Sequence, residues 1–147
     1  MYKVNLYLET SIRGLQKTIG WYGYVLEYMD RKGSRHIREA YKYEVGVTPN
    51  MIVLMALDAA LGRLNRKSEV TVFSDNVYLR EGCMRRLKLW QENGWKTAHG
   101  EPVKNKVLWQ QVAEKMSRHR VTFSSEYHHE YKNRLSAELT NRRMGYV

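Results

Sequence analysis

One carboxylate in the sequence follows an apolar run so closely that it could do chemistry. Residues 70–75 read VTVFSD, so the β-type run of residues 70–73 ends just before Asp75. In open α/β sheets, ligands bind beyond the carboxyl ends of the strands, where an acid can hold a metal ion or a proton. The alternative is structural, because Ser, Asp and Asn at a strand-to-helix junction cap the free amides of the next helix. The motif alone favours the cap.

A second group of metal-ligand residue types lies near the C-terminus, at Glu126, His128, His129 and Glu130. Adjacent side chains project in different directions in both helices and strands. We therefore do not expect these four side chains to converge on one ion.

The charge of the chain predicts the class of partner. There are 25 Lys and Arg against 15 Asp and Glu, which gives a net charge of +10. Such an excess attracts polyanions over a Debye length, although it says nothing about the fold. Nucleic acid is the first expected partner, and an acidic protein is the second.

Composition narrows the class of protein further. A chain of 147 residues has the length of one domain, and 43% hydrophobic residues with two prolines are typical of a globular fold. The single cysteine excludes an internal disulfide and fits a reducing, cytoplasmic location. No window approaches the roughly 18 apolar residues of a membrane span, and the first residues do not resemble a signal peptide, so we expect no membrane partner.

The pattern of apolar residues predicts an α/β fold. Residues 3–9 alternate as a strand does, and residues 21–30 and 36–46 form a hairpin across a turn signal. Thr48 and Pro49 are typical of a helix N-cap and first helical position. The remaining elements are expected in the order helix, strand, helices, strand and helix, at residues 51–64, 70–73, 77–93, 105–116, 120–125 and 131–143. This order predicts a mixed sheet with helices packed on it.

Residues 87–112, LKLWQENGWKTAHGEPVKNKVLWQQV, resemble the basic helix-and-loop protrusion of type 1 ribonuclease H. The matching positions are Trp90, residues 94–97, residues 102–105, Leu108 and Trp109. The resemblance extends over nearly the whole chain. It implies a single ribonuclease H-like domain over residues 1–147, with a five-stranded mixed sheet (three antiparallel strands, then two parallel ones) flanked by helices.

The resemblance also implies a catalytic site with four carboxylates around two divalent ions, which activate water and stabilise the leaving oxygen. The first and third acids correspond to Glu9 and Asp75. The second corresponds to Val53, and the fourth to Ala137 or, in the other alignment, to Ser136. With two acids missing, we expect hydrolysis to be lost or strongly impaired, and Glu9 and Asp75 to remain as a remnant able to hold one ion at most.

Other features of the implied site differ from the family. The family's flexible histidine corresponds to His129, or to His128 in a shifted frame. The turn after the first strand, residues 10–20, is bulkier and more basic than the family's glycine-rich turn. We therefore interpret Asp75 as a remnant that is now more a helix cap than a ligand. Nucleic-acid binding should need no cofactor, and Mg²⁺ or Mn²⁺ should matter only if some cleavage remains.

Binding residues are better preserved than catalytic ones. Thr48, Asn50, Lys104 and Asn105 match positions at which the family grips the phosphates and sugars of the DNA strand. Cations interleaved with aromatic residues suit phosphate contact and stacking. The full set of expected binding residues is Thr48, Asn50, Arg85, Arg86, Lys88, Trp90, Lys96, Lys104 and Asn105. Trp95 and Trp109 are expected in the core, and Trp90 is left open between the two roles.

Three functions follow from these features. The preferred one is a ribonuclease H-like protein that binds an RNA/DNA hybrid or another duplex without cleaving it. The second is an active metal-dependent hybrid endoribonuclease with a rearranged site, which uses Glu9, Asp75 and either Glu138 or His129. The third is a regulatory module that docks an acidic protein partner.

Overall fold

A computed structural model describes residues 1–11, 17–126 and 129–143, and these residues contain a five-stranded sheet in the order β3-β2-β1-β4-β5. Strand β1 pairs antiparallel with β2, and β2 pairs antiparallel with β3. On its other side β1 pairs parallel with β4, which pairs parallel with β5. The strands are β1 (Tyr2–Thr10), β2 (Thr18–Met29), β3 (Arg35–Val47), β4 (Ser68–Phe73) and β5 (Arg120–Ser124). The mixed sheet expected from the resemblance is confirmed.

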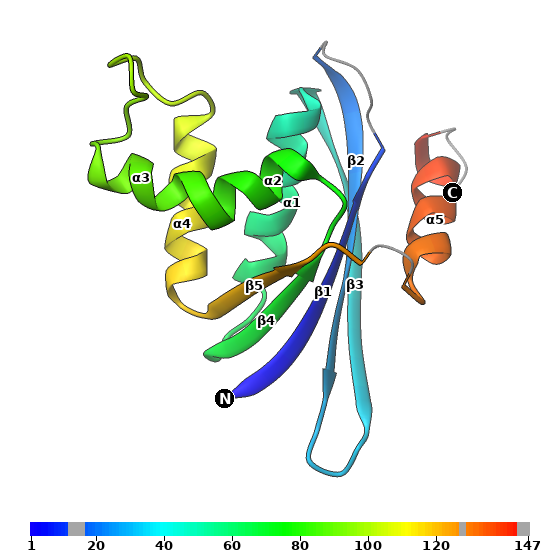
Figure 1. Cartoon of the computed structure of the whole chain (residues 1–147). Helices are drawn as coiled ribbons and strands as arrows, with labels where there is room; N and C mark the ends of the chain where they lie inside the picture. The colour runs from blue at the N-terminus through cyan, green and yellow to red at the C-terminus, as the bar shows by residue number, and fades with distance from the viewer. Residues whose placement is uncertain (12–16, 127–128, 144–147) are drawn as a thin grey trace.

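Helices cover both faces of this sheet unequally (Figure 1). The helices α1 to α4 lie on one face, and α5 lies on the other. Their bounds are α1 (Pro49–Gly62), α2 (Val77–Glu81), the π-helical turn η1 (Gly82–Arg86), α3 (Leu87–Glu92), α4 (Lys106–Ser117) and α5 (Lys132–Arg143). The segment 77–93, expected as helical, is therefore interrupted by a π-turn. Within the described ranges, no helix is both long and apolar enough to cross a membrane.

Helix α1 is buried on most sides between the sheet and α4. Its side chains Ile52, Leu54 and Leu57 are fully buried, as expected for a helix that is apolar nearly all round. The helix begins where the sequence predicts, because the Thr48 hydroxyl accepts the backbone N–H of Met51 at 3.2 Å and Pro49 occupies the first turn.

Strand alternation sorts the side chains of β1 between two hydrophobic clusters. Leu6 and Leu8 belong to the larger core under α1. Tyr7 points the other way and packs with Leu135 of α5 in a smaller cluster. Glu9 has the same parity as Tyr7, so its carboxylate lies on the α5 side of the sheet at the end of β1.

Candidate functional site

The two acids expected to survive from the catalytic set lie at one edge of the sheet. In the parallel register, Tyr7 pairs with Phe73, so Glu9 and Asp75 each lie two residues farther along neighbouring strands. The Glu9 side chain is 7% exposed and that of Asp75 is 49% exposed. The structure thus places one buried and one half-exposed carboxylate at the carboxyl ends of β1 and β4, where open sheets bind ligands.

A lysine from α5 reaches both acids. Nζ of Lys132 lies 2.5 Å from Oε2 of Glu9 and 3.9 Å from Oδ2 of Asp75. Its side chain is 25% exposed. Lys132 is not among the site residues that the sequence predicts. A signal was present, however, because Lys132 precedes Ser136 by four residues and so shares its helix face.

The expectation that Asp75 serves mainly as a helix cap is wrong. Helix α2 is capped by the next residue, Asn76, whose Oδ1 accepts the backbone N–H of Leu79 at 2.8 Å. The Ser74 hydroxyl accepts the backbone N–H of Asn76 at 3.2 Å and so fixes the turn. The Asp75 carboxylate is left to face Lys132.

The central helix offers no acid to this edge. Val53, at the position of the family's glutamate, is 2% exposed and belongs to the main core. Asp58, farther along the same helix, instead accepts a hydrogen bond from Nζ of Lys115 on α4 at 2.9 Å. The charge of Asp58 is therefore used to join two helices.

The structure also distinguishes the two alignments of the terminal helix. Ser136 lines a hollow of about 150 Å³ together with Glu9, Thr140 and Arg143. Ala137 is exposed and does not line this hollow. Of the two candidate positions, Ser136 is thus the one that shares a hollow with Glu9, and it offers a hydroxyl rather than a carboxylate.

His129 packs against the sheet. Its ring centroid lies 4.4 Å from that of Tyr7, and its Nδ1 accepts the backbone N–H of Tyr131 at 3.2 Å. Burial lowers the pKa of His129, and the positive charge of Lys132 lowers it further. These surroundings favour a neutral ring. The alternative candidate, His128, lies outside the described residues.

The side chains gathered around Glu9 and Asp75 do not fit a two-ion centre. Among the residues that the structure describes, no group of three or more His, Cys, Asp or Glu side chains could hold a metal ion. Mg²⁺ requires a near-octahedral set of oxygen ligands. Here an ammonium group lies within 4 Å of both remaining carboxylates.

Residues 85–106, here called the protrusion, form an ordered platform beside α4. Trp95 has a φ of 63°, and its N–H donates to the Trp90 carbonyl at 2.7 Å. The N–H of Val103 donates to the Trp95 carbonyl at 3.1 Å, and the Asn93 side chain donates to the Lys96 carbonyl at 3.0 Å. These bonds fold the loop back on itself and fix its backbone.

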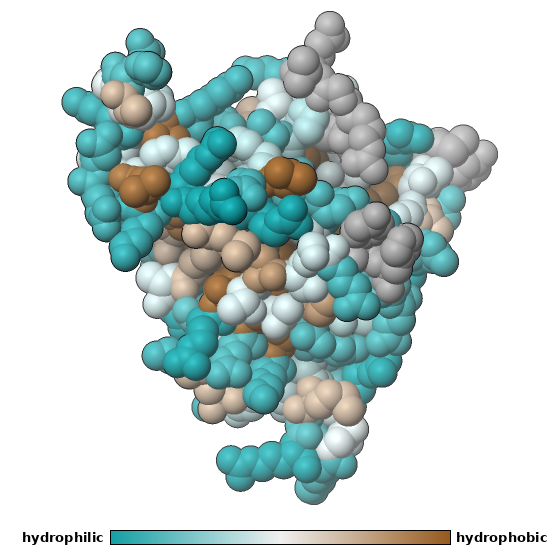
Figure 2. Space-filling view, viewed as in Figure 1, coloured by the Kyte–Doolittle hydropathy of each residue, from teal (hydrophilic) through white to brown (hydrophobic). Residues whose placement is uncertain are grey.

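The protrusion displays cations on this platform. Arg85 is paired with Glu81 at 3.2 Å, but its side chain is still 79% exposed. The other exposed cations, for which the described residues provide no ion pair, are Arg86, Lys88, Lys96, Lys104 and Lys106. Figure 2 shows mostly hydrophilic residues over this part of the molecule, interrupted by small apolar patches. The arrangement suits contact with a row of phosphates.

The tryptophans support the platform from beneath. Trp109 is fully buried, and its indole N–H donates to the Tyr78 hydroxyl at 2.8 Å. Trp90 packs edge-on against Trp109 with ring centroids 5.2 Å apart. Trp90 and Trp95 are both partly buried against the main core. The prediction that Trp95 and Trp109 pack in the core is confirmed, and Trp90 also packs against the core.

The other expected binding residues lie at helix starts. Thr48 and Asn50 are partly exposed at the beginning of α1. Asn105 precedes α4 with a φ of 60°, a conformation that Asn tolerates better than most residues, and its amide donates to the Tyr78 hydroxyl at 3.3 Å. The polar groups of Thr48, Asn50 and Asn105 are thus positioned by the ends of helices rather than by loops.

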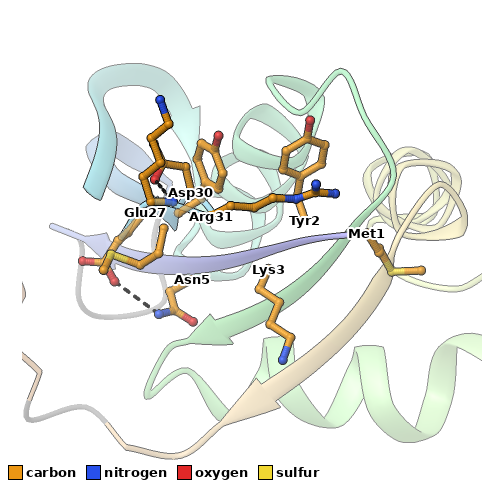
Figure 3. A pocket seen from close by; sticks show the side chains of 10 residues that line it. Met1, Tyr2, Lys3, Asn5, Glu27, Asp30 and Arg31 are labelled. Atoms are coloured by element: carbon orange, nitrogen blue, oxygen red, sulfur yellow. Dashed lines mark hydrogen bonds between the residues drawn. The ribbon is translucent and has the colours of Figure 1, made fainter. Parts of the chain in front are cut away.

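A hollow of about 910 Å³ lies around the opposite end of β1 and the β2–β3 hairpin (Figure 3). Glu27 in its wall is a buried acid whose oxygens accept hydrogen bonds from the Tyr131 hydroxyl at 2.6 Å and the Asn5 amide at 3.2 Å. Arg35 lies 3.5 Å from the same carboxylate. Glu27 therefore ties α5 to the sheet rather than pointing an unsatisfied charge into the hollow.

Comparisons with known proteins agree with this architecture. The RNase H family model matches residues 1–143. A ribonuclease H of Clostridium botulinum (strain Hall, type A) is 35% identical over 150 residues, which cover 98% of this chain and 97% of that protein.

Two solved structures share the fold. The crystal structure of LC9-RNase H1, a type 1 RNase H with the type 2 active-site motif, has a TM-score of 0.80 at 22% identity, covering 99% of this chain and 74% of that chain. The foamy viral protease-reverse transcriptase in complex with RNA/DNA hybrid has a TM-score of 0.71 at 17% identity. That match covers 95% of this chain and 20% of the viral one.

Proposed function

Because the chain belongs to the ribonuclease H family, we propose that it binds an RNA/DNA hybrid, or another duplex, and no longer cleaves it. The binding half of the proposal is supported by the family and by the foamy viral relative that holds RNA/DNA hybrid. The loss of hydrolysis is supported by the chain's own residues at the sheet edge.

One observation carries the loss of hydrolysis: an ammonium group lies within 4 Å of both remaining acids. Lys132 contacts Glu9 at 2.5 Å and lies 3.9 Å from Asp75. The other two positions of the set hold Val53 and either Ala137 or Ser136, none of which supplies a carboxylate. Losing transition-state stabilisation of several kcal/mol lowers a rate by roughly a thousandfold or more.

Binding would use the protrusion and the start of α1. Lys96 and Lys104 are exposed cations on a loop held by backbone hydrogen bonds. Thr48 and Asn50 lie at a helix N-terminus, whose free amides favour phosphate oxygens. Contacts of this kind fix the register and orientation of a duplex without reading its sequence. We therefore expect affinity that depends on salt but little on sequence.

The second candidate is an active hybrid ribonuclease, favoured by 35% identity to a protein named ribonuclease H. It would have to use Glu9 and Asp75 with Glu138 or His129. Glu138 is engaged by Arg142 one helical turn away, at 2.9 Å. The His129 ring packs at a tilt against the ring of Tyr7. Both groups would have to leave their present contacts to join the two acids.

Two measurements with one substrate test the proposal. The first is binding of a labelled RNA/DNA hybrid at low salt in EDTA, where we expect a salt-sensitive complex. The second is incubation of the same hybrid with Mg²⁺ or Mn²⁺, where we expect no cleavage. Cleavage that disappears in Asp75→Asn would establish the second candidate, and absence of binding to any duplex would refute the first.

A further inference from the structure

The ammonium of Lys132 is held in place by the way α5 docks. The residue before it, Tyr131, is buried and donates a hydrogen bond to Glu27 at 2.6 Å. Leu135, one turn farther on, is fully buried in the same cluster as Tyr7. These two buried contacts fix the first turn of α5. The side chain of Lys132 is therefore directed at the sheet edge rather than into solvent.

The hollow lined by Glu9, the acid that Lys132 contacts, has the character of a site for a phosphodiester. Its lining combines hydroxyl groups with one guanidinium, from Thr10, Ser11, Ser136, Thr140 and Arg143, around the buried Glu9. Without cations, two carboxylates would repel a nucleic-acid backbone. With Lys132 and Arg143 present, the charges at this edge balance.

We propose that Lys132 is the resident cation of this edge, replacing the divalent ion and allowing a nucleic-acid phosphate to approach without any metal. This inference rests on the proposed duplex binding. A divalent ion would have to displace this ammonium before it could use the carboxylates of Glu9 and Asp75. Lys132 thus excludes the metal ion. It also provides the positive charge with which the ion would have attracted phosphate.

The test compares Lys132→Met, which keeps most of the length of the side chain and removes its charge, with a matched control. Lys115→Met removes an ammonium of similar exposure, 23% against 25%, that pairs with Asp58 at 2.9 Å away from the sheet edge. Each protein is titrated with Mn²⁺ alone, and bound ion is read by electron paramagnetic resonance. Hybrid affinity is measured in EDTA and in Mg²⁺.

We expect the unmodified protein and Lys115→Met to take up no Mn²⁺ below about 1 mM and to bind hybrid equally in EDTA and Mg²⁺. In Lys132→Met, Mn²⁺ should bind at the freed acids. Hybrid affinity in EDTA should fall roughly fivefold or more and recover when Mg²⁺ is added. Lys132→Arg, which keeps the charge, should behave as the unmodified protein does.

The Mn²⁺ titration needs no nucleic acid, so it separates the two proposals. If no duplex binds the unmodified protein but Mn²⁺ binds only Lys132→Met, the proposed function fails and the exclusion of metal stands. If Lys132→Met binds no Mn²⁺ and keeps its affinity in EDTA, the resident cation is refuted. If Lys132→Met does not fold, the unmodified protein decides, because Mn²⁺ uptake below 1 mM or a need for Mg²⁺ in hybrid binding would overturn the inference.

Discussion

The indole ring of Trp109 lies so close to the α-carbon of Gly82 that a methyl group built there would be 2.0 Å from ring carbon Cη2. Gly82 opens the π-helical turn, and Trp109 is fully buried. The approach of these two residues joins the start of the protrusion to α4. The helical turn just before the protrusion is thus packed against α4 through a contact that only glycine permits.

Gly82→Ala should therefore destabilise the protein by at least about 2 kcal/mol, because neither the ring nor the backbone can move away cheaply. The measurement is urea unfolding at equilibrium. Gly62→Ala is a matched control, since a methyl group there would meet Lys115 at an ordinary 3.5 Å. That substitution should be neutral or stabilise by up to about 1 kcal/mol. Equal effects of the two substitutions would contradict the packing described here.

Lys96→Ala and Lys104→Ala should each weaken hybrid binding and lower the log-log salt slope by about 1, since each removes one phosphate contact. The slope is obtained from affinities measured across a range of KCl concentrations. Lys67→Ala is the control, because Lys67 is exposed just before β4, at the edge opposite to Asp75. An unchanged slope in both protrusion variants would remove the protrusion from the binding surface.

Restoring acids one at a time should not restore cleavage. Val53→Glu alone places a carboxylate in a core position and should cost about 2 to 4 kcal/mol of stability. Val53→Glu combined with Ser136→Asp and Lys132→Met rebuilds the four acids and removes the competing cation. We expect Mn²⁺-dependent cleavage of hybrid in the triple variant only, and its loss when Asp75→Asn is added.

Acid should destabilise the fold through His119. Its Nδ1 accepts the Ser68 backbone N–H at 3.1 Å, and burial, followed by the charge of Arg118, lowers its pKa below the ordinary value of 6.5. As the pH falls, the imidazole of His119 is therefore protonated in the unfolded chain before it is protonated in the folded protein. The contribution to stability is complete above about pH 6.5 and decreases as the pH falls toward the folded pKa.

His119→Asn, whose side-chain oxygen can also accept a hydrogen bond, should lessen the drop in melting temperature between pH 7.5 and pH 5.5. The exposed His99 provides the comparison, since His99→Asn removes an imidazole with no such bond. An equal reduction in both variants would show that His119 is not the group responsible.

Local sequence features are sufficient to predict most of the helices and strands. The alternation in residues 3–9 identified β1, and the Thr48–Pro49 pair located the start of α1 within one residue. The turn between β2 and β3 was also predicted, because Gly33 with φ 83° and the Asp30 carboxylate are typical turn features. In each case the determining contacts lie within a few residues along the chain.

The features that were missed depend on distant or ambiguous partners. Lys132 and Glu9 are 123 residues apart, so no local pattern links them. The π-turn at Gly82 packs closely against Trp109, which belongs to another helix. Asp75 and Asn76 are equally good caps by residue type, and the backbone conformation decides between them.

Among the described residues, α5 is the one helix on its face of the sheet (Figure 1). Partial opening of a terminal element costs less free energy than global unfolding. Detachment of this helix would expose Tyr7 and Val25 to water and withdraw the ammonium from the acids in a single step. The local electrostatic potential would turn negative as the helix left, so the attraction of this edge for a polyanion is coupled to the docking equilibrium of the twelve residues of α5.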